Sequence, residues 1–274
     1  MAKSALLKSS LAKKYWMALT GLFLCLFLVG HLIGNLQLIF GDALQFNQYA
    51  LFMTSNPAVK ALSYVTYISI IFHAVDGIIL TIQNQKARPV GYAYERPQAN
   101  STWQSRNMAV LGTVILVFIV THMVNFWAKM HFDKNMPLQT MSVQANPVLP
   151  PQNYYLTTNG NYLPVDGVAI KNRTEFYSKE VDVKIGEGYK DLHKITVAFF
   201  KDKQYGLIAT LLYVVAMAVL AFHLNHGFAS AFQSLGANHQ KYNGLIRGFG
   251  FWFSVIVPLL FAIIPLYIHF VLKA

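Results

Sequence analysis

Five histidines lie deep inside apolar segments of this chain, where an imidazole is costly to bury without a partner. They are His31, His73, His122, His223 and His226. At least one falls in each of four successive segments, and "AFHLNHGF" (221–228) holds two of them three residues apart. Because neutral imidazole is a common metal ligand, this pattern predicts a metal centre within the segments. For the remaining histidines we expect solvent or lipid-headgroup contact: His131, His193, His239 and His269.

The apolar segments are long enough to cross a bilayer, which takes about 20 helical residues. Their expected bounds are Tyr15–Ile39, Ala58–Ile82, Met108–Ala128, Tyr205–Ala231 and Gly248–Leu272. The chain of 274 residues is 55% hydrophobic and 12% charged, about half the charged fraction of a soluble domain. The first segment is too long for a signal peptide and should be retained. We therefore expect an all-α integral membrane protein with one domain, a five-helix bundle, over residues 1–274.

The net charge of +11 is explained by membrane topology better than by nucleic-acid binding. Most basic residues outside 129–203 lie before the first segment, between the second and third segments, or between the fourth and fifth. The only acidic residue in these regions is Glu95. The basic residues are Lys3, Lys8, Lys13, Lys14, Lys86, Arg88, Arg96, Arg106, Lys241 and Arg247. Since positive loops face the cytoplasm, we expect a cytoplasmic N-terminus and an external C-terminus.

Residues 129–203 form a connection too long to be passive in a compact domain. On the expected topology they lie outside the cytoplasm, as a cap over the bundle between the third and fourth helices. The stretch "NGNYLPVDG" (159–167) predicts turns, and "EVDVKI" (180–185) predicts a short strand.

The histidines pair by their expected depth in the membrane. His31 lies 17 residues beyond Lys14 and His122 lies 16 beyond Arg106, so both are roughly 25 Å from the cytoplasmic edge. His73, which lies 13 residues before Lys86, and His223 should lie roughly 20 Å or less from the same edge. Two pairs at two depths favour two bis-histidine haems stacked across the membrane.

Small residues beside the ligands would leave room for such a group, because positions three and four residues apart share a helix face. Gly34, Gly77 and Gly227 follow His31, His73 and His223 in this way, and Asn125 follows His122.

Other chemistry remains open at this point. Zinc would favour carboxylate or thiolate partners, but Asp76 is the only acid within the segments. The single cysteine, Cys25, excludes disulfides, thiolate zinc sites and Cys-ligated iron–sulphur clusters within this chain. A transporter with histidine proton relays, and simple hydrogen bonding between helices, are the remaining alternatives.

Four short motifs on successive segments resemble those of a known family. They are "GHLIGN" (30–35), "FHAVDG" (72–77), "THMVN" (121–125) and "FHLNHGF" (222–228). Together they resemble the five-helix, dihaem cytochrome b (b558 type) membrane anchor of succinate dehydrogenase and quinol:fumarate reductase. The resemblance covers the five segments, about half of the chain.

This resemblance implies specific roles for the histidines. His31 and His122 would bind the distal haem, and His73 and His223 the proximal haem. His226 would lie behind the ligands, near a haem propionate or a quinone. Three cations close to segment ends could pair with propionates: Lys14, Arg106 and Arg247.

The function implied is electron transfer between succinate or fumarate and a membrane quinone, with menaquinone expected. A flavoprotein carrying FAD and an iron–sulphur subunit would dock on the cytoplasmic face of a bacterial inner membrane. Quinone chemistry moves protons, so Asp42 and Asp76 are candidates for the quinone site. Some fumarate reductases of the family carry a glutamate two residues before the fourth-helix histidine; here Ala221 stands there, so that proton route is not expected.

Two further classes stay open: a cytochrome b anchor of another dehydrogenase, of the hydrogenase or formate dehydrogenase type, and a transporter without redox chemistry. The first predicts a different partner protein, and the second predicts no haem absorption.

Overall fold

The computed structural model describes residues 9–87, 89–90, 96–144 and 150–273. Lys3, Lys8, Arg88 and Glu95, which enter the topology prediction, lie outside these described residues.

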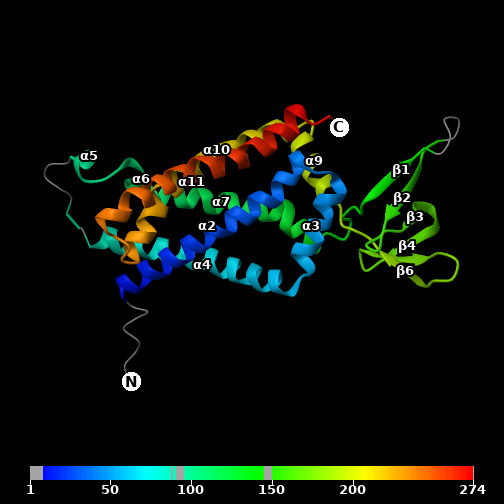
Figure 1. Ribbon diagram of the computed structural model, residues 1–274, viewed down its shortest axis with the longest axis horizontal. Coiled ribbons are helices and arrows are strands. Elements are labelled where there is room, and N and C mark those ends of the chain that lie inside the picture. Colours follow the sequence, from blue (N-terminus) through cyan, green and yellow to red (C-terminus); the bar gives the residue numbers. More distant parts are fainter. Residues whose placement is uncertain (1–8, 88, 91–95, 145–149, 274) are drawn as a thin grey trace, which may run out of the picture.

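Within the described residues, five helices are long and apolar enough to cross a membrane, which confirms the predicted number and order of spans. They are α2 (Ser10–Phe40), α4 (Pro57–Lys86), α7 (Met108–His122) with its continuation to Phe132, α10 (Gly206–Ser234) and α11 (Gln240–Leu266) with its continuation to Val271. The chain is therefore a multi-pass membrane protein. Figure 1 shows the five helices running back and forth along one axis.

Side-chain caps define where several helices begin. Ser9 accepts a hydrogen bond from the amide of Leu11 at the start of α2, and Asn56 accepts from Ala58 and Val59 at the start of α4. Asp202 accepts from the amides of Gln204 and Tyr205, just before α10. Ser9 and Asn56 satisfy amide groups that a helix N-terminus leaves without an intrahelical partner, and Asp202 fixes the turn that leads into α10.

Two of the spans end in a π-helical turn. η1 (Met123–Ala128) follows α7 directly after His122 and leads into α8 (Lys129–Phe132), and η3 (Tyr267–Val271) follows α11. Pro265 lies just before η3, and a proline inside a helix removes one hydrogen bond of the α-helical ladder. The apolar pattern of the sequence predicts a helix in both places but not the wider turn.

Short helices complete the two ends of the bundle. α3 (Ala43–Ser55) and α9 (Leu192–Lys201) lie at one end, and α5 (Pro97–Asn100) and α6 (Trp103–Arg106) at the other (Figure 1). The main apolar core joins α2, α3, α9, α11 and η3; its buried members are Leu32, Leu38, Phe46, Phe200, Val257, Ile264 and Ile268.

Residues 129–203 differ from the all-α prediction, which holds for the membrane helices alone. After α8 the segment forms two three-stranded antiparallel sheets. The first contains β1 (Thr140–Val143), β2 (Gln152–Leu156) and β3 (Tyr162–Pro164), and the second β4 (Val168–Lys171), β5 (Glu175–Ser178) and β6 (Lys184–Glu187). We call these two sheets the cap; Figure 1 shows it beyond α3 and α9, at one end of the bundle.

Both local predictions inside the cap are right only in part. The stretch 159–167 includes strand β3 and the 3-10 turn η2 (Val165–Gly167) as well as a turn at Gly160. In the stretch 180–185 the strand begins only at Lys184, because Asp182 adopts a left-handed conformation (φ 50°) that closes the β5–β6 hairpin.

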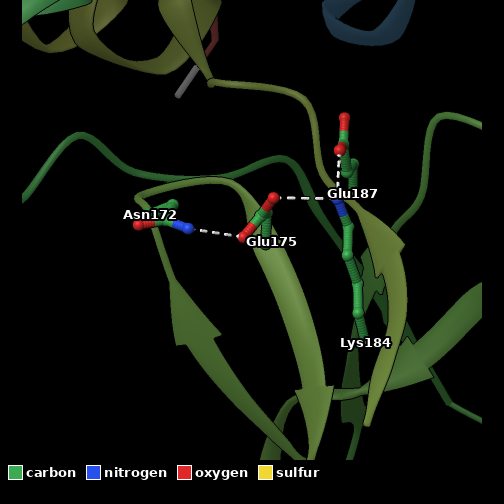
Figure 2. Close-up of polar contacts among 4 residues, drawn as sticks. All are labelled: Asn172, Glu175, Lys184 and Glu187. Carbon is green, nitrogen blue, oxygen red and sulfur yellow. Dashed lines mark hydrogen bonds and ion pairs between the residues drawn. The ribbon is translucent and has the colours of Figure 1, made fainter.

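The cap has its own small core and an ion-paired outer face. Leu138, Val168 and the fully buried Phe176 pack together, and the ring of Tyr155 stacks on Phe176 across the two sheets. On the outer face the Lys184 ammonium lies 2.8 Å from a Glu175 carboxylate oxygen and 2.5 Å from one of Glu187 (Figure 2). Hydrogen bonding to Lys184 holds the pKa of Glu175 below its usual value, and hydrogen bonding to Glu175 and Glu187 raises the pKa of Lys184.

A buried asparagine joins the cap to the bundle. Asn47 of α3 is 1% exposed; its amide nitrogen donates to the side chain of Gln139 and, over 2.8 Å, to Asp191. Its carbonyl oxygen accepts the backbone amide of His193, 3.0 Å away. Asp191 in turn caps α9 by accepting the amide of Lys194. All polar atoms of the Asn47 amide group therefore act in fixing α3, α9 and the cap together.

Candidate functional site

The first histidine pair joins α2 to α7. The rings of His31 and His122 face each other edge to face, with centroids 5.9 Å apart and an interplanar angle of 89°. Aromatic rings surround both imidazoles. Phe27 stacks on His31 at 5.3 Å and Phe118 on His122 at 5.7 Å, so the pair lies in a largely apolar environment.

Polar neighbours of this pair come from α10 and α2. The hydroxyl of Tyr213, on α10, lies 3.4 Å from Nδ1 of His122. The amide nitrogen of Asn35 donates to the backbone carbonyl of His31 over 2.8 Å and lies 3.4 Å from its Nδ1. These contacts restrict the orientation of both rings.

The second pair joins α4 to α10. The rings of His73 and His223 have centroids 6.2 Å apart at an interplanar angle of 66°. Nδ1 of His73 lies 3.2 Å from the carbonyl oxygen of Met17 and 3.3 Å from the hydroxyl oxygen of Thr20, both on α2. The Thr20 hydroxyl donates its own hydrogen to the carbonyl of Trp16 at 2.7 Å. Both neighbours of Nδ1 therefore act as acceptors, which assigns the proton to Nδ1 and leaves the Nε2 lone pair available.

His223 differs from its partner in one respect. Its Nδ1 is buried and has no hydrogen-bond partner among the described residues. A buried ring nitrogen without a hydrogen-bond partner is free to interact with a bound group, which is consistent with a ligand role for His223.

Two glycines that were not predicted from the sequence adjoin the second pair. A Cβ at Gly21 of α2 would lie 3.1 Å from Cε1 of His73, and one at Gly112 of α7 would lie 3.8 Å from Cε1 of His223. Gly21 lies ten residues before His31 on α2, and Gly112 lies ten residues before His122 on α7. At 1.5 Å per residue, the two histidine pairs are about 15 Å apart along the helices.

The glycines expected to leave room beside the ligands separate into two kinds. A Cβ at Gly77 meets no atom within 4 Å, and one at Gly227 meets only the side-chain end of Met108, at 3.6 Å. Gly34 is different, because a Cβ there would overlap the ring of Tyr49. The expectation for Gly34 is therefore wrong: its lack of a side chain allows α3 to pack on α2.

The other predicted site residues lie apart from the ring contacts. His226 is half-buried and lies one turn beyond His223 on α10. Asp76 is half-buried, and its carboxylate is close enough to His73 to interact with it electrostatically. Asp42 caps α3 by accepting the amide of Gln45 at 2.7 Å.

The cations predicted to pair with propionates are exposed and share one end of the bundle. Lys14 lies near the start of α2, Arg106 in α6 and Arg247 in the first part of α11, all at the end opposite the cap (Figure 1). The guanidinium of Arg106 also donates to the backbone carbonyl of Ser101. The basic segments expected to share one side of the membrane thus lie at one end of the bundle.

The four histidines assigned to solvent or headgroup contact have defined roles in the fold. Nδ1 of His269 lies 2.6 Å from the carbonyl of Phe200, and Nδ1 of His131 lies 2.8 Å from that of Trp127. His239 caps α11. His193 is half-buried next to Asn47; burial lowers its pKa, which the carboxylates of Asp191 and Asp42 partly restore.

The donor atoms at both pairs suit an iron porphyrin with two axial imidazoles. Two rings bound to opposite sides of one metal at about 2 Å per metal–nitrogen bond have centroids roughly 6 Å apart, close to both observed separations. No group of three or more His, Cys, Asp or Glu side chains that could hold a metal ion occurs among the described residues. Two imidazoles are fewer protein ligands than a zinc ion usually has, so a metal bound at either pair would need further ligands, such as those that a porphyrin supplies.

Comparisons with protein-family models, with curated proteins and with solved structures find no match to this chain. The fold and the site thus define the class, a five-helix membrane protein with two interhelical histidine pairs.

Proposed function

We propose that this chain is a dihaem cytochrome b that anchors a succinate:quinone oxidoreductase in the membrane. The observation that supports it is the presence of two histidine pairs, His31 with His122 and His73 with His223, about 15 Å apart along the bundle. Each pair joins two different helices and lies within the membrane-spanning part of the chain.

The protein's own residues would hold the cofactors and restrict their chemistry. A haem b held by two imidazoles has no open coordination position and so supplies reversible one-electron transfer. Met17 and Thr20 orient His73 through Nδ1, as partners behind a metal ligand usually do. Phe27, Phe118 and Phe126 surround the first pair and exclude water from it.

The identity of the partners rests on the resemblance of the four histidine motifs. In this proposal a flavoprotein with FAD and an iron–sulphur subunit bind at the end of the bundle that carries Lys14, Arg106 and Arg247. That end faces the cytoplasm of a bacterium, and the histidine pair nearer to it, His73 with His223, is the proximal one. Electrons then pass between succinate or fumarate and a membrane quinone, with menaquinone favoured.

The test is a dithionite-reduced minus air-oxidised spectrum of the purified chain, with a pyridine haemochrome assay for haem per chain. We expect two haem b, with one lost in His31→Ala and one lost in His73→Ala. His239→Ala is the matched control, since it removes an imidazole outside both pairs and should retain both haems. A chain without a Soret band, made with ample haem, would exclude the cytochrome function.

A second measurement separates the partner assignment from haem binding. The tagged chain is purified from its native membrane, and co-purifying proteins are tested for covalent flavin and for haem reduction by succinate. A haem-containing chain that brings down a hydrogenase or formate dehydrogenase instead would retain the cytochrome and reject the succinate partner.

A further inference from the structure

Two cations of the cap hold the end of the third span. The ammonium of Lys190 donates to the carbonyl of Met130 over 2.6 Å, and the guanidinium of Arg173 donates to the carbonyl of His131 over 2.5 Å. Both carbonyls belong to the last turn of α8, where helix carbonyls lack intrahelical donors. Each cation uses one N–H in this way, which leaves two on Lys190 and four on Arg173.

These two cations lie close together without a carboxylate between them. Burial lowers the pKa of Lys190, and the charge of Arg173 lowers it further. The ion pairs found among the described residues join Lys171 to Asp182 and Lys184 to Glu175 and Glu187, so none involves either cation. Asp133, the next acid along the chain after α8, accepts the amide of Asn135. Two neighbouring positive charges therefore repel each other, and no described carboxylate lies within ion-pair distance of either one.

The backbone at Arg173 adds to the cost of this arrangement. Asn172 and Arg173 connect β4 to β5 with φ of 49° and 70°. That left-handed conformation suits asparagine and glycine but is uncommon for arginine. A glycine would make the turn more easily, so arginine at this position carries a conformational cost.

The surroundings place both cations where a lipid headgroup would lie. Trp127 and Phe132 pack edge to face at the end of the same span, and Phe132 is 68% exposed. Exposed aromatic side chains at the end of a membrane helix mark the interface between hydrocarbon and water. Basic residues at that level attract anionic headgroups.

We propose that Arg173 and Lys190 bind the phosphate group of an anionic ligand at the junction of cap and bundle, with an anionic phospholipid such as phosphatidylglycerol as the source. The phosphate oxygens accept the remaining N–H donors of both cations and offset their mutual repulsion. The acyl chains of the lipid lie against Trp127 and Phe132. This site is independent of haem binding.

The test compares the binding of phosphatidylglycerol and phosphatidylcholine to the purified full-length chain by native mass spectrometry. We expect the preference for phosphatidylglycerol to fall about tenfold in Arg173→Gln/Lys190→Gln. The control variant, Lys134→Gln/Lys179→Gln, removes the same net charge. Lys179 donates to the carbonyl of Asp166 within the cap, and Lys134 is exposed just beyond α8, so this control should keep the preference.

Two further measurements use a variant that conserves both charges and competition by inorganic phosphate. Arg173→Lys/Lys190→Arg keeps both charges and should keep the preference even where it weakens the junction. If phosphatidylglycerol stays bound in excess inorganic phosphate, the lipid is the source of the bound phosphate group. If inorganic phosphate displaces it, free phosphate is the ligand. An equal preference in the wild-type chain and in Arg173→Gln/Lys190→Gln would overturn the proposal.

Discussion

A single hydroxyl helps to orient the imidazole of His73. Thr20 donates its hydrogen to Trp16, so its oxygen accepts from Nδ1 of His73 and leaves Nε2 as the basic nitrogen. Thr20→Val keeps the shape of the side chain and removes this acceptor. We expect haem at the second pair to be retained about tenfold more weakly, as for other partners behind metal ligands.

Haem titration into the apoprotein measures this effect without any enzyme activity. The matched control is Thr113→Val, because the Thr113 hydroxyl donates only to Ala109, one turn away on α7. Equal haem affinity in Thr20→Val and the wild-type chain would show that Met17 alone orients His73.

Gly77 permits a sharper test of the space next to His73. Since a Cβ there meets no atom within 4 Å, Gly77→Leu should fold normally. If the space belongs to a haem, the larger side chain should remove one haem per chain in the haemochrome assay while the other remains. Gly244→Leu, on an exposed part of α11 with the same open surroundings, is the control and should retain two. Two haems in Gly77→Leu would place the porphyrin elsewhere.

At the scale of elements, Asn47 determines how firmly α3 and α9 hold the cap. Asn47→Ala removes three hydrogen bonds. Gln139 loses its donor, the amide of His193 loses its acceptor, and Asp191 keeps only the amide of Lys194. Unsatisfied buried groups cost about 1–3 kcal/mol, so opening of this junction should become about fivefold to a hundredfold more frequent. Hydrogen exchange of the α9 amides measures this opening. Asn153→Ala, at an exposed position of β2, should leave the exchange unchanged.

His193 makes the same junction sensitive to pH. Phe46, Asp191 and Asp42 lie around its half-buried imidazole, and burial lowers its pKa below the usual 6.5. The unfolded chain then binds the proton more readily than the folded one just below pH 6.5, so the junction loses stability as the pH falls through that range. Thermal unfolding in detergent should show a smaller loss between pH 7 and about pH 5.5 for His193→Gln. An identical pH profile for both chains would assign the dependence to another group.

Which elements can be predicted from the sequence depends on where their stabilising contacts lie. A run such as Tyr15–Ile39 carries its own signal, because an apolar segment of this length must form a helix in a bilayer. The expected depth of each histidine also indicates which histidines meet, since that depth is calculated from the residue spacing and the rise per residue of a helix alone. Gly21 and Thr20 adjoin His73 through packing between α2 and α4, more than 50 residues away, and no local pattern indicates such contacts.

The cap was expected from the sequence, but its two sheets and the π-turns escaped prediction for a related reason. Strands of three to five residues such as β3 and β6 are held by pairing and by the contact of Phe176 with Tyr155, which local propensity does not encode. The π-turn after His122 has the same apolar composition as an ordinary helix. Gly34 lies on the same helix face as His31, as predicted. It contacts Tyr49 of α3, however, a helix that was not predicted from the sequence.

At the scale of the whole molecule, the two ends of the bundle differ in a way that sets its direction in the membrane. Basic residues at the start of α2, at the end of α4, in α6 and in the first part of α11 lie at one end, and the cap lies at the other (Figure 1). The positive-inside rule then predicts that Ala237, between α10 and α11, faces the cytoplasm and that Ser142, on β1, faces outward. Cys25, the only native cysteine, is buried within α2 and should react little.

Single cysteines at these two exposed positions turn that direction into a labelling experiment. A membrane-impermeant maleimide should label Ser142→Cys in intact spheroplasts and Ala237→Cys only after lysis. The opposite pattern would place the cap in the cytoplasm, and the flavoprotein and iron–sulphur subunits would then have to dock on the sheets and not on the basic end. Because His31 with His122 lies nearer to the cap, the same inversion would exchange the proximal and distal pairs, so this one measurement decides the order of the proposed electron path.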